Sequence, residues 1–171
     1  DDIIYAYGPT GGASSAVQNT VYGGDGNDTI YAEQGGDYLS GDAGNDAING
    51  ANGADTIIGG TGDDTLKGNN GDDIYHFAYG DGNDVIEEKS GSDKILFDAS
   101  VTLAMLDITR LNNNDVLIEV DGGAGGSITI NYQTYGVGAI VETLEFSDSS
   151  TLDMTLLDYT LEGTSAGETL Y

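Results

Sequence analysis

The residues of this sequence that could carry chemistry are aspartates that recur at every ninth position. From residue 23 to residue 76 the chain reads as six uninterrupted units, GGDGNDTIY, AEQGGDYLS, GDAGNDAIN, GANGADTII, GGTGDDTLK and GNNGDDIYH. The sixth residue of each unit is Asp, namely Asp28, Asp37, Asp46, Asp55, Asp64 and Asp73. After three further residues, GDGNDVIE resumes the pattern and adds Asp84 in the same role. Because the chain has no Cys and one His, these carboxylates offer oxygen ligands suited to a hard cation rather than to zinc or copper.

The other fixed positions of the unit predict the backbone that holds these carboxylates. Position four is always Gly, at Gly26, Gly35, Gly44, Gly53, Gly62 and Gly71. Position eight is always large and apolar or aromatic, at Ile30, Leu39, Ile48, Ile57, Leu66 and Tyr75. Glycine permits a turn over positions one to six, and positions seven to nine alternate around one apolar side chain, as in a very short strand. We therefore expect a flattened coil, a narrow solenoid in which two units complete one circuit.

Such a coil stacks unit n on unit n+2 and sorts the aspartates into two rows. The first row is Asp28, Asp46 and Asp64 on one edge, and the second is Asp37, Asp55 and Asp73 on the opposite edge. With strands about 4.8 Å apart, neighbouring carboxylates repel by roughly 3 to 4 kcal/mol per pair at an effective dielectric constant of about 20. Each buried position-eight side chain returns about 1.5 to 3 kcal/mol, whereas ordering each backbone residue costs about 1 to 2 kcal/mol. The coil is therefore predicted to need a cation, and calcium, with about 6 to 8 oxygen ligands in flexible geometry, fits best.

At these residues the sequence resembles the RTX (repeats-in-toxin) family, whose nonapeptide GGxGxDxUx is a haemolysin-type calcium-binding signature. The resemblance covers residues 23–88 and implies an all-β fold, a parallel β-roll. It also implies calcium held between successive turns by position-six Asp and by backbone carbonyls of the glycine-rich turn. Carried onto this sequence, it nominates the six aspartates of the repeats and Asp84 as ligands. The carbonyl candidates are Gly23, Gly24, Gly26, Gly35, Gly41, Gly44, Gly50, Gly53, Gly59, Gly60, Gly62, Gly68 and Gly71.

Some acidic and neighbouring residues depart from this pattern. The unit AEQGGDYLS has Ala32 and Glu33 where two glycines are usual, which weakens the site at Asp37. Asn19 stands where Asp would be in a preceding degenerate unit. The remaining turn aspartates are predicted to be solvated or to lie outside the ligand set; they are Asp25, Asp42, Asp63, Asp72 and Asp81.

The composition fits a cation-binding chain and excludes several other partners. The 171 residues include 30 Asp plus Glu against 4 Lys plus Arg, which gives a net charge of −26. Nucleic acids and anionic membrane surfaces would repel such a chain. About five calcium ions at +2 would cancel about ten of these charges. No apolar run reaches the ~18 residues of a membrane-spanning helix, and the first residues lack the basic start of a signal peptide.

The distribution of glycine predicts four segments along the chain. A degenerate first repeat and a loop rich in Gly and Ser occupy residues 1–22, the β-roll occupies 23–91, a C-terminal β cap occupies 92–160, and 161–171 begin a further repeat. In the cap we expect antiparallel structure with strands at 94–97, 115–120, 127–132 and 140–146, and a turn at 121–123. Residues 101–106 fit either a short helical turn or another strand.

No catalytic role is predicted for this chain. It contains neither HExxH nor GxSxG, and His76, its one histidine, falls at the outward position nine of a repeat. Any catalytic domain of a parent protein is expected outside these residues. Two binding functions of a bacterial surface adhesin stay open as alternatives. Ice binding would need rows of Thr, which positions three and five lack, and ligand or adhesion binding could use Tyr132, Tyr135 and Tyr159, which ordinary strand and core positions explain as well.

The resemblance implies a calcium-binding module that folds when it meets extracellular calcium. It implies a larger parent protein, a toxin, hydrolase or adhesin, exported by the type I secretion machinery of a Gram-negative bacterium and secreted or held at the cell surface. Carboxylate repulsion would keep the segment extended where calcium is scarce, and calcium binding would drive the roll to form outside. A monomer without a transmembrane segment is expected.

Overall fold

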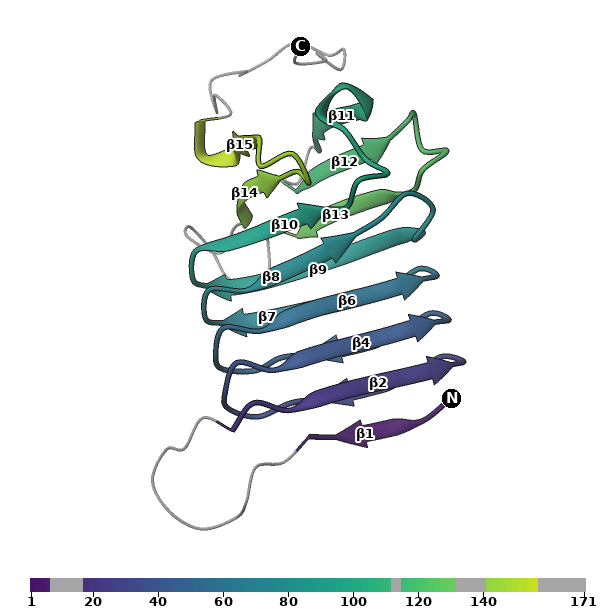
Figure 1. The fold of residues 1–171 in the computed structure, drawn as a ribbon, viewed down its shortest axis with the longest axis vertical. Coiled ribbons are helices and arrows are strands. Elements are labelled where there is room, and N and C mark those ends of the chain that lie inside the picture. Colours follow the sequence, from purple (N-terminus) through teal and green to yellow (C-terminus); the bar gives the residue numbers. More distant parts are fainter. Residues whose placement is uncertain (7–16, 112–114, 132–140, 157–171) are drawn as a thin grey trace.

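The computed structural model describes residues 1–6, 17–111, 115–131 and 141–156, which wind into a flattened coil with a β-sheet on each side (Figure 1). The first sheet has the order β1 (Ile3–Tyr5), β3 (Thr29–Tyr31), β5 (Ala47–Asn49), β7 (Thr65–Asn70), β9 (Asn83–Ser90), β13 (Ser127–Asn131), β12 (Val116–Val120) and β11 (Leu106–Arg110). The second has the order β15 (Thr151–Asp153), β14 (Val141–Glu145), β10 (Asp93–Phe97), β8 (Ile74–Phe77), β6 (Thr56–Thr61), β4 (Tyr38–Ala43) and β2 (Thr20–Asp25). Two short 3₁₀ turns, Leu103–Met105 and Met154–Leu156, complete the described elements.

The register of the parallel strands confirms that two units complete one circuit. In the first sheet Thr29 pairs with Ala47, and in the second Tyr38 pairs with Thr56, so that each residue lies beside the one eighteen positions later. The degenerate first repeat stacks in the same way at a longer spacing, because Ile4 of β1 pairs with Ile30 of β3, 26 residues later. The predicted parallel β-solenoid is therefore confirmed.

The space between the two sheets is filled by the position-eight side chains. Ile30, Leu39, Ile48, Ile57, Leu66 and Tyr75 are each at most 2% exposed. Positions seven and nine point outward and, apart from the buried Ser40, are partly or fully exposed, as the alternation along a strand requires. One inward side chain per unit thus supplies most of the apolar core of the repeats, to which Ala32 adds.

Several strands of the repeats are longer than the three residues expected for positions seven to nine. β2, β4, β6 and β7 each continue through positions one to three of the next unit. The prediction of a turn over all of positions one to six was therefore wrong. The reason is that positions two and three also pair between coils, as Gly24 does with Asp42 and Asp42 with Gly60.

The C-terminal strands are built directly onto the last coil of the repeats. β13 lies parallel to β9 and β14 parallel to β10, after which β12, β11 and β15 add antiparallel strands at the two outer edges. The predicted cap strands are present as β10, β12, β13 and β14. Residues 101–106 contain the 3₁₀ turn at Leu103–Met105 and then begin β11.

Some predictions concern residues outside the described part of the chain. These are the loop at 8–15, Tyr132, Tyr135, Tyr159 and the further repeat at 161–171. Within the described ranges, no helix is both long and apolar enough to cross a membrane.

Candidate metal centre

The position-six aspartates form two hydrogen-bonded ladders, one on each edge of the coil. In each ladder the backbone N–H of one aspartate donates to Oδ1 of the aspartate one coil later. The distances on the first edge are 2.7 Å from Asp28 to Asp46, 2.7 Å from Asp46 to Asp64 and 3.0 Å from Asp64 to Asp84. On the second edge they are 2.8 Å for each step from Asp37 through Asp55 and Asp73 to Asp93. The structure therefore brings the predicted aspartates into the two predicted rows.

Seven of these eight carboxylates have a second oxygen without a hydrogen-bond partner among the described residues. The orphaned, buried atoms are Oδ2 of Asp28, Asp37, Asp46, Asp55, Asp64, Asp73 and Asp93. The seven nominated aspartates are 0 to 3% exposed. A buried carboxylate oxygen without a partner costs on the order of several kcal/mol unless a proton or a cation compensates it. Rows of such oxygens are a donor set that fits hard cations.

Glycine at position one keeps free the space beside five of the seven orphaned oxygens. A Cβ placed on Gly23 would lie 2.7 Å from Oδ2 of Asp28 and 2.6 Å from the carbonyl oxygen of Gly41. A Cβ on Gly41 would in turn meet Oδ2 of Asp46 and lie 2.6 Å from the carbonyl oxygen of Gly59. The same contact with the aspartate of the same unit recurs at Gly50, Gly59 and Gly68. We call each such space a cradle; those at Gly23, Gly41 and Gly50 are bordered by a carboxylate and a carbonyl oxygen, which is the donor chemistry that calcium prefers.

Glycine at position four serves the stacking of the coils. Its φ lies between +114° and +139° in all six units, a region that side-chain-bearing residues rarely adopt. A Cβ on Gly44 would collide with the carbonyl of Gly26, and one on Gly62 with the carbonyl of Gly44. These glycines are thus explained by close approach of the backbone, and their role as carbonyl ligands stays a prediction.

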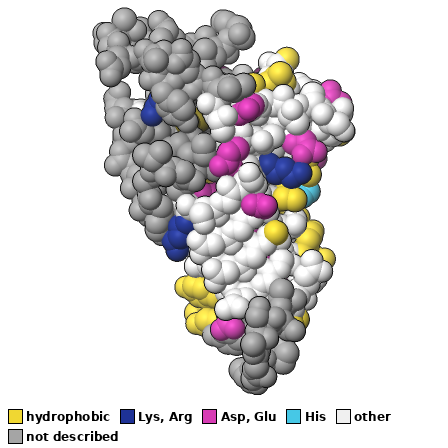
Figure 2. Space-filling view, turned by 90° about the vertical axis from the view of Figure 1, so that its left-hand side faces the viewer, with side chains coloured by type: hydrophobic (Ala, Val, Ile, Leu, Met, Phe, Trp, Pro, Cys, Tyr) yellow, Lys and Arg dark blue, Asp and Glu magenta, His cyan; other side chains and the backbone are white. Residues whose placement is uncertain are grey.

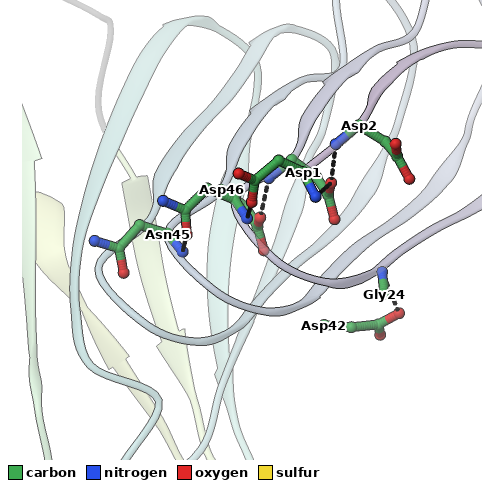
Figure 3. Close-up of polar contacts among 8 residues, drawn as sticks. Asp1, Asp2, Gly24, Asp42, Asn45 and Asp46 are labelled. Carbon is green, nitrogen blue, oxygen red and sulfur yellow. Dashed lines mark hydrogen bonds and ion pairs between the residues drawn. The ribbon is translucent and has the colours of Figure 1, made fainter.

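The residue at position two has a left-handed backbone in several units, and in one coil that residue is an aspartate. Asp42 has φ of 72°, and its Oδ2 accepts a hydrogen bond of 3.2 Å from the N–H of Gly24 in the coil before (Figure 3). Its Oδ1 accepts a hydrogen bond from Ser40. Asp42 is therefore satisfied by hydrogen bonds and lies outside the row of orphaned oxygens. Figure 3 also shows Asn45 and Asp46, adjacent in sequence, at the turn of this same edge.

Burial makes the charged form of the ladder carboxylates unfavourable. It raises the pKa of Asp55 to about 7 and the pKa of Asp64 to about 6, and neighbouring aspartates of the same row add to both shifts. Burial likewise raises the pKa of Asp73 to about 6 and of Asp84 to about 8, and it raises the pKa of Asp46. The hydrogen bond from the backbone N–H opposes each shift without cancelling it. The metal-free ladders therefore favour proton uptake near neutral pH.

The surface of the second edge hides its carboxylates. Figure 2 views the molecule from the side toward which β1 points in Figure 1, and there the stacked turns show mainly backbone and uncharged polar groups. Asp37, Asp55 and Asp73 of this edge are buried beneath that surface. Of the other turn aspartates, Asp25, Asp63 and Asp72 are exposed, as predicted, whereas Asp42 and Asp81 are half-buried.

Two residues that depart from the repeat pattern, Asn19 and Ala32, have defined places in the coil. The N–H and Nδ2 of Asn19 both donate to Oδ1 of Asp37, so that Asn19 continues the ladder without adding a carboxylate. Ala32 takes the position-one place on the second edge. Its N–H donates to the carbonyl of Asn49, as the N–H of Gly50 donates to the carbonyl of Lys67 in the next coil.

His76 is half-buried on an outer strand position, and burial, with Lys94 nearby, lowers its pKa.

Sequence analysis missed two acidic residues that the fold places at the end of the second row. Asp93 accepts the N–H of Asp73 and so belongs to the ladder, and Glu88 is buried beside it. A signal for Asp93 was present, since Gly91, Asp93 and Ile95 repeat positions four, six and eight of the unit. Burial raises the pKa of Asp93 to about 7 and of Glu88 to about 8.

Comparison with known families agrees with this geometry. Residues 18–48 and 49–86 match the family model of the RTX calcium-binding nonapeptide repeat (4 copies). No curated protein matches the chain. The matched stretch contains both aspartate rows from Asp28 to Asp84. Residues 18–86 of this chain are thus a block of RTX calcium-binding nonapeptide repeats.

Proposed function

We propose that the repeat block binds several calcium ions in the cradles of its two edges and folds as it does so. The proposed carboxylate ligands are Asp28, Asp37, Asp46, Asp55, Asp64, Asp73 and Asp84, joined by turn carbonyls of the glycines nominated from the sequence. The observation that carries the proposal is the set of buried, unpartnered Oδ2 atoms of the six repeat aspartates, five of which lie beside a glycine at position one.

The donor set favours calcium over other biological cations. The polar atoms that border the cradles are carboxylate and carbonyl oxygens, joined at Gly68 by the phenol oxygen of Tyr75, whereas zinc and copper prefer imidazole or thiolate. The stacked coils offer these oxygens from two successive turns, which suits the high and variable coordination number of calcium better than the strict octahedron of magnesium. Bound calcium supplies the positive charge that lets the buried carboxylates stay ionised. About five ions would neutralise about ten charges.

This arrangement makes folding conditional on calcium. Neighbouring carboxylates within a row repel each other by roughly 3 to 4 kcal/mol per pair, and their burial adds a desolvation penalty. Only binding to the folded coil offsets both terms, so calcium binding and roll formation are linked. Where free calcium is scarce, the chain would stay extended.

We place this module in a larger protein that leaves a Gram-negative cell through type I secretion and folds outside, in solution or at the cell surface. The support is the match to RTX repeats together with the conditional fold, which would let an unfolded chain pass a narrow channel. Within this proposal, residues 1–22 are a degenerate repeat and loop, 23–91 the calcium roll, 92–160 the cap and 161–171 a further repeat. The module is proposed to act as a monomer.

Far-ultraviolet circular dichroism of the chain in EDTA and in millimolar calcium tests the proposal. We expect a strong gain of β signal on adding calcium, and little gain in the same concentration of magnesium. Isothermal titration calorimetry on the same sample should give several ions per chain. Equal β content in EDTA and in calcium, or no heat of calcium binding, would refute the proposal.

A further inference from the structure

The last coil of the repeats departs from the regular spacing on the second edge. Successive ladder partners on this edge are 18 residues apart from Asp55 to Asp73 but 20 apart from Asp73 to Asp93. The two extra residues precede β9, because Thr65 of β7 already pairs with Val85, 20 residues later; the pairing of β9 with β7 then shifts between Lys67 and Asn69. Glu88 lies at this shift. It pairs with Asn69, the residue that follows Gly68 in β7. Glu88 thus brings a carboxylate to a place where the preceding coils have glycine.

The side chain of Glu88 points into the coil rather than away from it. Glu88 is 1% exposed, and its Oε1 accepts a hydrogen bond from the phenol of Tyr75. The phenol in turn accepts the N–H of Gly68 at 2.7 Å. A Cβ placed on Gly68 would meet both Oε1 of Glu88 and Oδ2 of Asp73. Glu88 and Asp73 therefore face the same cradle from two successive coils, and Tyr75 fixes the orientation of Glu88.

Asp93 completes a group of three carboxylates. One carboxylate oxygen from each of Asp73, Glu88 and Asp93 lies within 4.8 Å of the other two. Asp73 is 0% exposed and Asp93 is 2% exposed, and Oδ2 of each has no hydrogen-bond partner among the described residues. These two unpartnered oxygens are independent of the acidic clustering itself and indicate a missing positive ligand.

The charge of this group distinguishes it from the regular cradles. A regular cradle is bordered by one orphaned aspartate oxygen and a carbonyl, whereas this one gathers three carboxylates. Three ionised carboxylates buried together need about two or more compensating charges, and oxygen-only donors select a hard cation. Because more ligand charge strengthens calcium binding, this position should fill before the regular cradles do.

We propose that Asp73, Glu88 and Asp93 make the last cradle of the second edge, beside Gly68, a calcium site of three carboxylates, with Tyr75 as its positioning residue. The site ties the roll to the C-terminal strands, because the N–H of Asp93 donates to Glu142 of β14 at 2.6 Å. The inference rests on the proposed calcium binding of the roll and gives one of its sites two ligands, Glu88 and Asp93, that lie beyond the matched repeats.

Calcium stoichiometry of matched variants tests this site. In Glu88→Gln we expect one calcium ion fewer than in the wild type, with the remaining ions bound as before. The control Glu87→Gln changes the adjacent residue, whose carboxylate pairs with Lys67 at 2.7 Å on the outer face, and should keep the wild-type number. Asp93→Asn should lose the same ion, so the double variant Glu88→Gln/Asp93→Asn should also lose one ion and no more.

The outcomes separate this inference from the proposed function. If the wild type binds no calcium, the proposed function fails. If the wild type binds several ions and Glu88→Gln binds the same number with the same affinities, Glu88 is a protonated partner of Tyr75 and only this inference is overturned. A loss of two ions in the double variant would likewise overturn it, because the two residues would then serve different ions.

Terbium luminescence gives a second readout that does not depend on how Glu88→Gln folds. Terbium replaces calcium at oxygen sites, and its emission is excited through a nearby tyrosine. The first equivalent of terbium should occupy the site with the most charge, beside Tyr75, so Tyr75→Phe should lose most of the emission at that equivalent. Tyr31→Phe, which changes an exposed outer-face ring, is the control. Unchanged first-equivalent emission in Tyr75→Phe would overturn the inference.

Discussion

The repeats and the C-terminal strands use the same coil but fill one of its positions with opposite chemistry. On the first edge the place of position six is taken by Asp28, Asp46, Asp64 and Asp84, and then by Ile128, which pairs in register with Asp84. Ile128 is 1% exposed and belongs to an apolar core that includes Ile118, Ile130 and Leu144. One region thus buries carboxylates that need a cation, and the other buries hydrocarbon that needs nothing further.

The repeats and the C-terminal strands therefore draw their stability from different sources, although they form one continuous fold. In the repeats one apolar side chain per unit is too little to order nine residues, since burial returns about 1.5 to 3 kcal/mol per side chain and ordering costs about 1 to 2 kcal/mol per residue. In the C-terminal strands alternate residues are buried, as in the pattern of β12, where Val116, Ile118 and Val120 all point inward. The C-terminal strands therefore offer the last coil of the repeats a preformed edge to stack on.

The largest predicted effect comes from removing negative charge from one aspartate row of the repeats. Asp46→Asn/Asp64→Asn keeps the Oδ1 acceptors for the ladder but removes two negative charges. We expect fewer bound calcium ions and an increase of about tenfold or more in the calcium concentration at which the roll folds, about 1.4 kcal/mol. In EDTA the same variant should be more structured than the wild type, because it no longer buries those charges.

Calorimetry and circular dichroism measure the two effects. Asp25→Ala/Asp63→Ala removes the same charge from exposed turn positions and is the matched control, expected to leave the number of ions unchanged. Equal calcium binding in the Asp46/Asp64 variant and in this control would contradict the assignment of Asp46 and Asp64 as calcium ligands.

Acid should partly replace calcium in the repeats. Burial raises the pKa of Asp55 and Asp93 to about 7 and of Asp84 to about 8, above the value of about 3.9 in an unfolded chain. The contribution of such a group to stability is fully present below the unfolded pKa and is lost as pH rises through the folded pKa. In EDTA we therefore expect β structure near pH 4 that disappears between about pH 4 and pH 8.

A pH titration followed by circular dichroism, with and without calcium, checks this expectation. Saturating calcium should abolish the loss of β structure across the same range, since the ions hold the carboxylates ionised. β content in EDTA that rose toward pH 8 would contradict the account.

Truncation of the C-terminal core should lower stability without changing the number of ions. Ile118 is fully buried in β12, so Ile118→Ala should lower the free energy of unfolding by about 2 to 5 kcal/mol. Leu103→Ala, at a position that is 48% exposed, is the control and should change it by less than about 0.5 kcal/mol. Urea unfolding in saturating calcium measures the loss, and a reduced calcium count for Ile118→Ala would show that the two regions are not separable in this way.

The smallest predicted effect concerns the one unit that lacks glycine at position one. Ala32→Gly should open the cradle beside Asp37 and strengthen calcium binding there, while lowering the stability of the metal-free chain by about 0.5 to 1 kcal/mol because glycine is more flexible. Gly50→Ala makes the reverse change one coil later, where the added Cβ would meet Oδ2 of Asp55. Calorimetry should show opposite changes in calcium binding, and changes of the same sign would count against the cradle.

Much of the repeat architecture could be predicted because each unit repeats the same local chemistry. Gly at position four, Asp at six and an apolar residue at eight determine which residues stack, and the two aspartate rows follow from the period alone. The extension of β4 and β6 through positions one to three was not predicted, since pairing there depends on the neighbouring coil rather than on local preference.

Glu88 was missed because its Glu-Glu-Lys stretch is typical of a solvated strand end. The alternation of β9 nevertheless buries Asp84, Ile86 and Glu88, and Glu88 lies beside Tyr75. Glu88 stands at position one and Asp93 at position six of one more unit, EKSGSDKIL, so both were available from the repeat frame.

Hydrogen exchange resolved along the chain tests the central claim most directly. In millimolar calcium the amides of the repeats from β3 to β8 should be protected to a similar degree as those of β12 and β13. In EDTA at neutral pH the account predicts that protection of the repeats is lost, while β12 and β13 keep the larger share of theirs. Equal protection of the repeats in EDTA and in calcium would contradict the claim that the cation completes this fold.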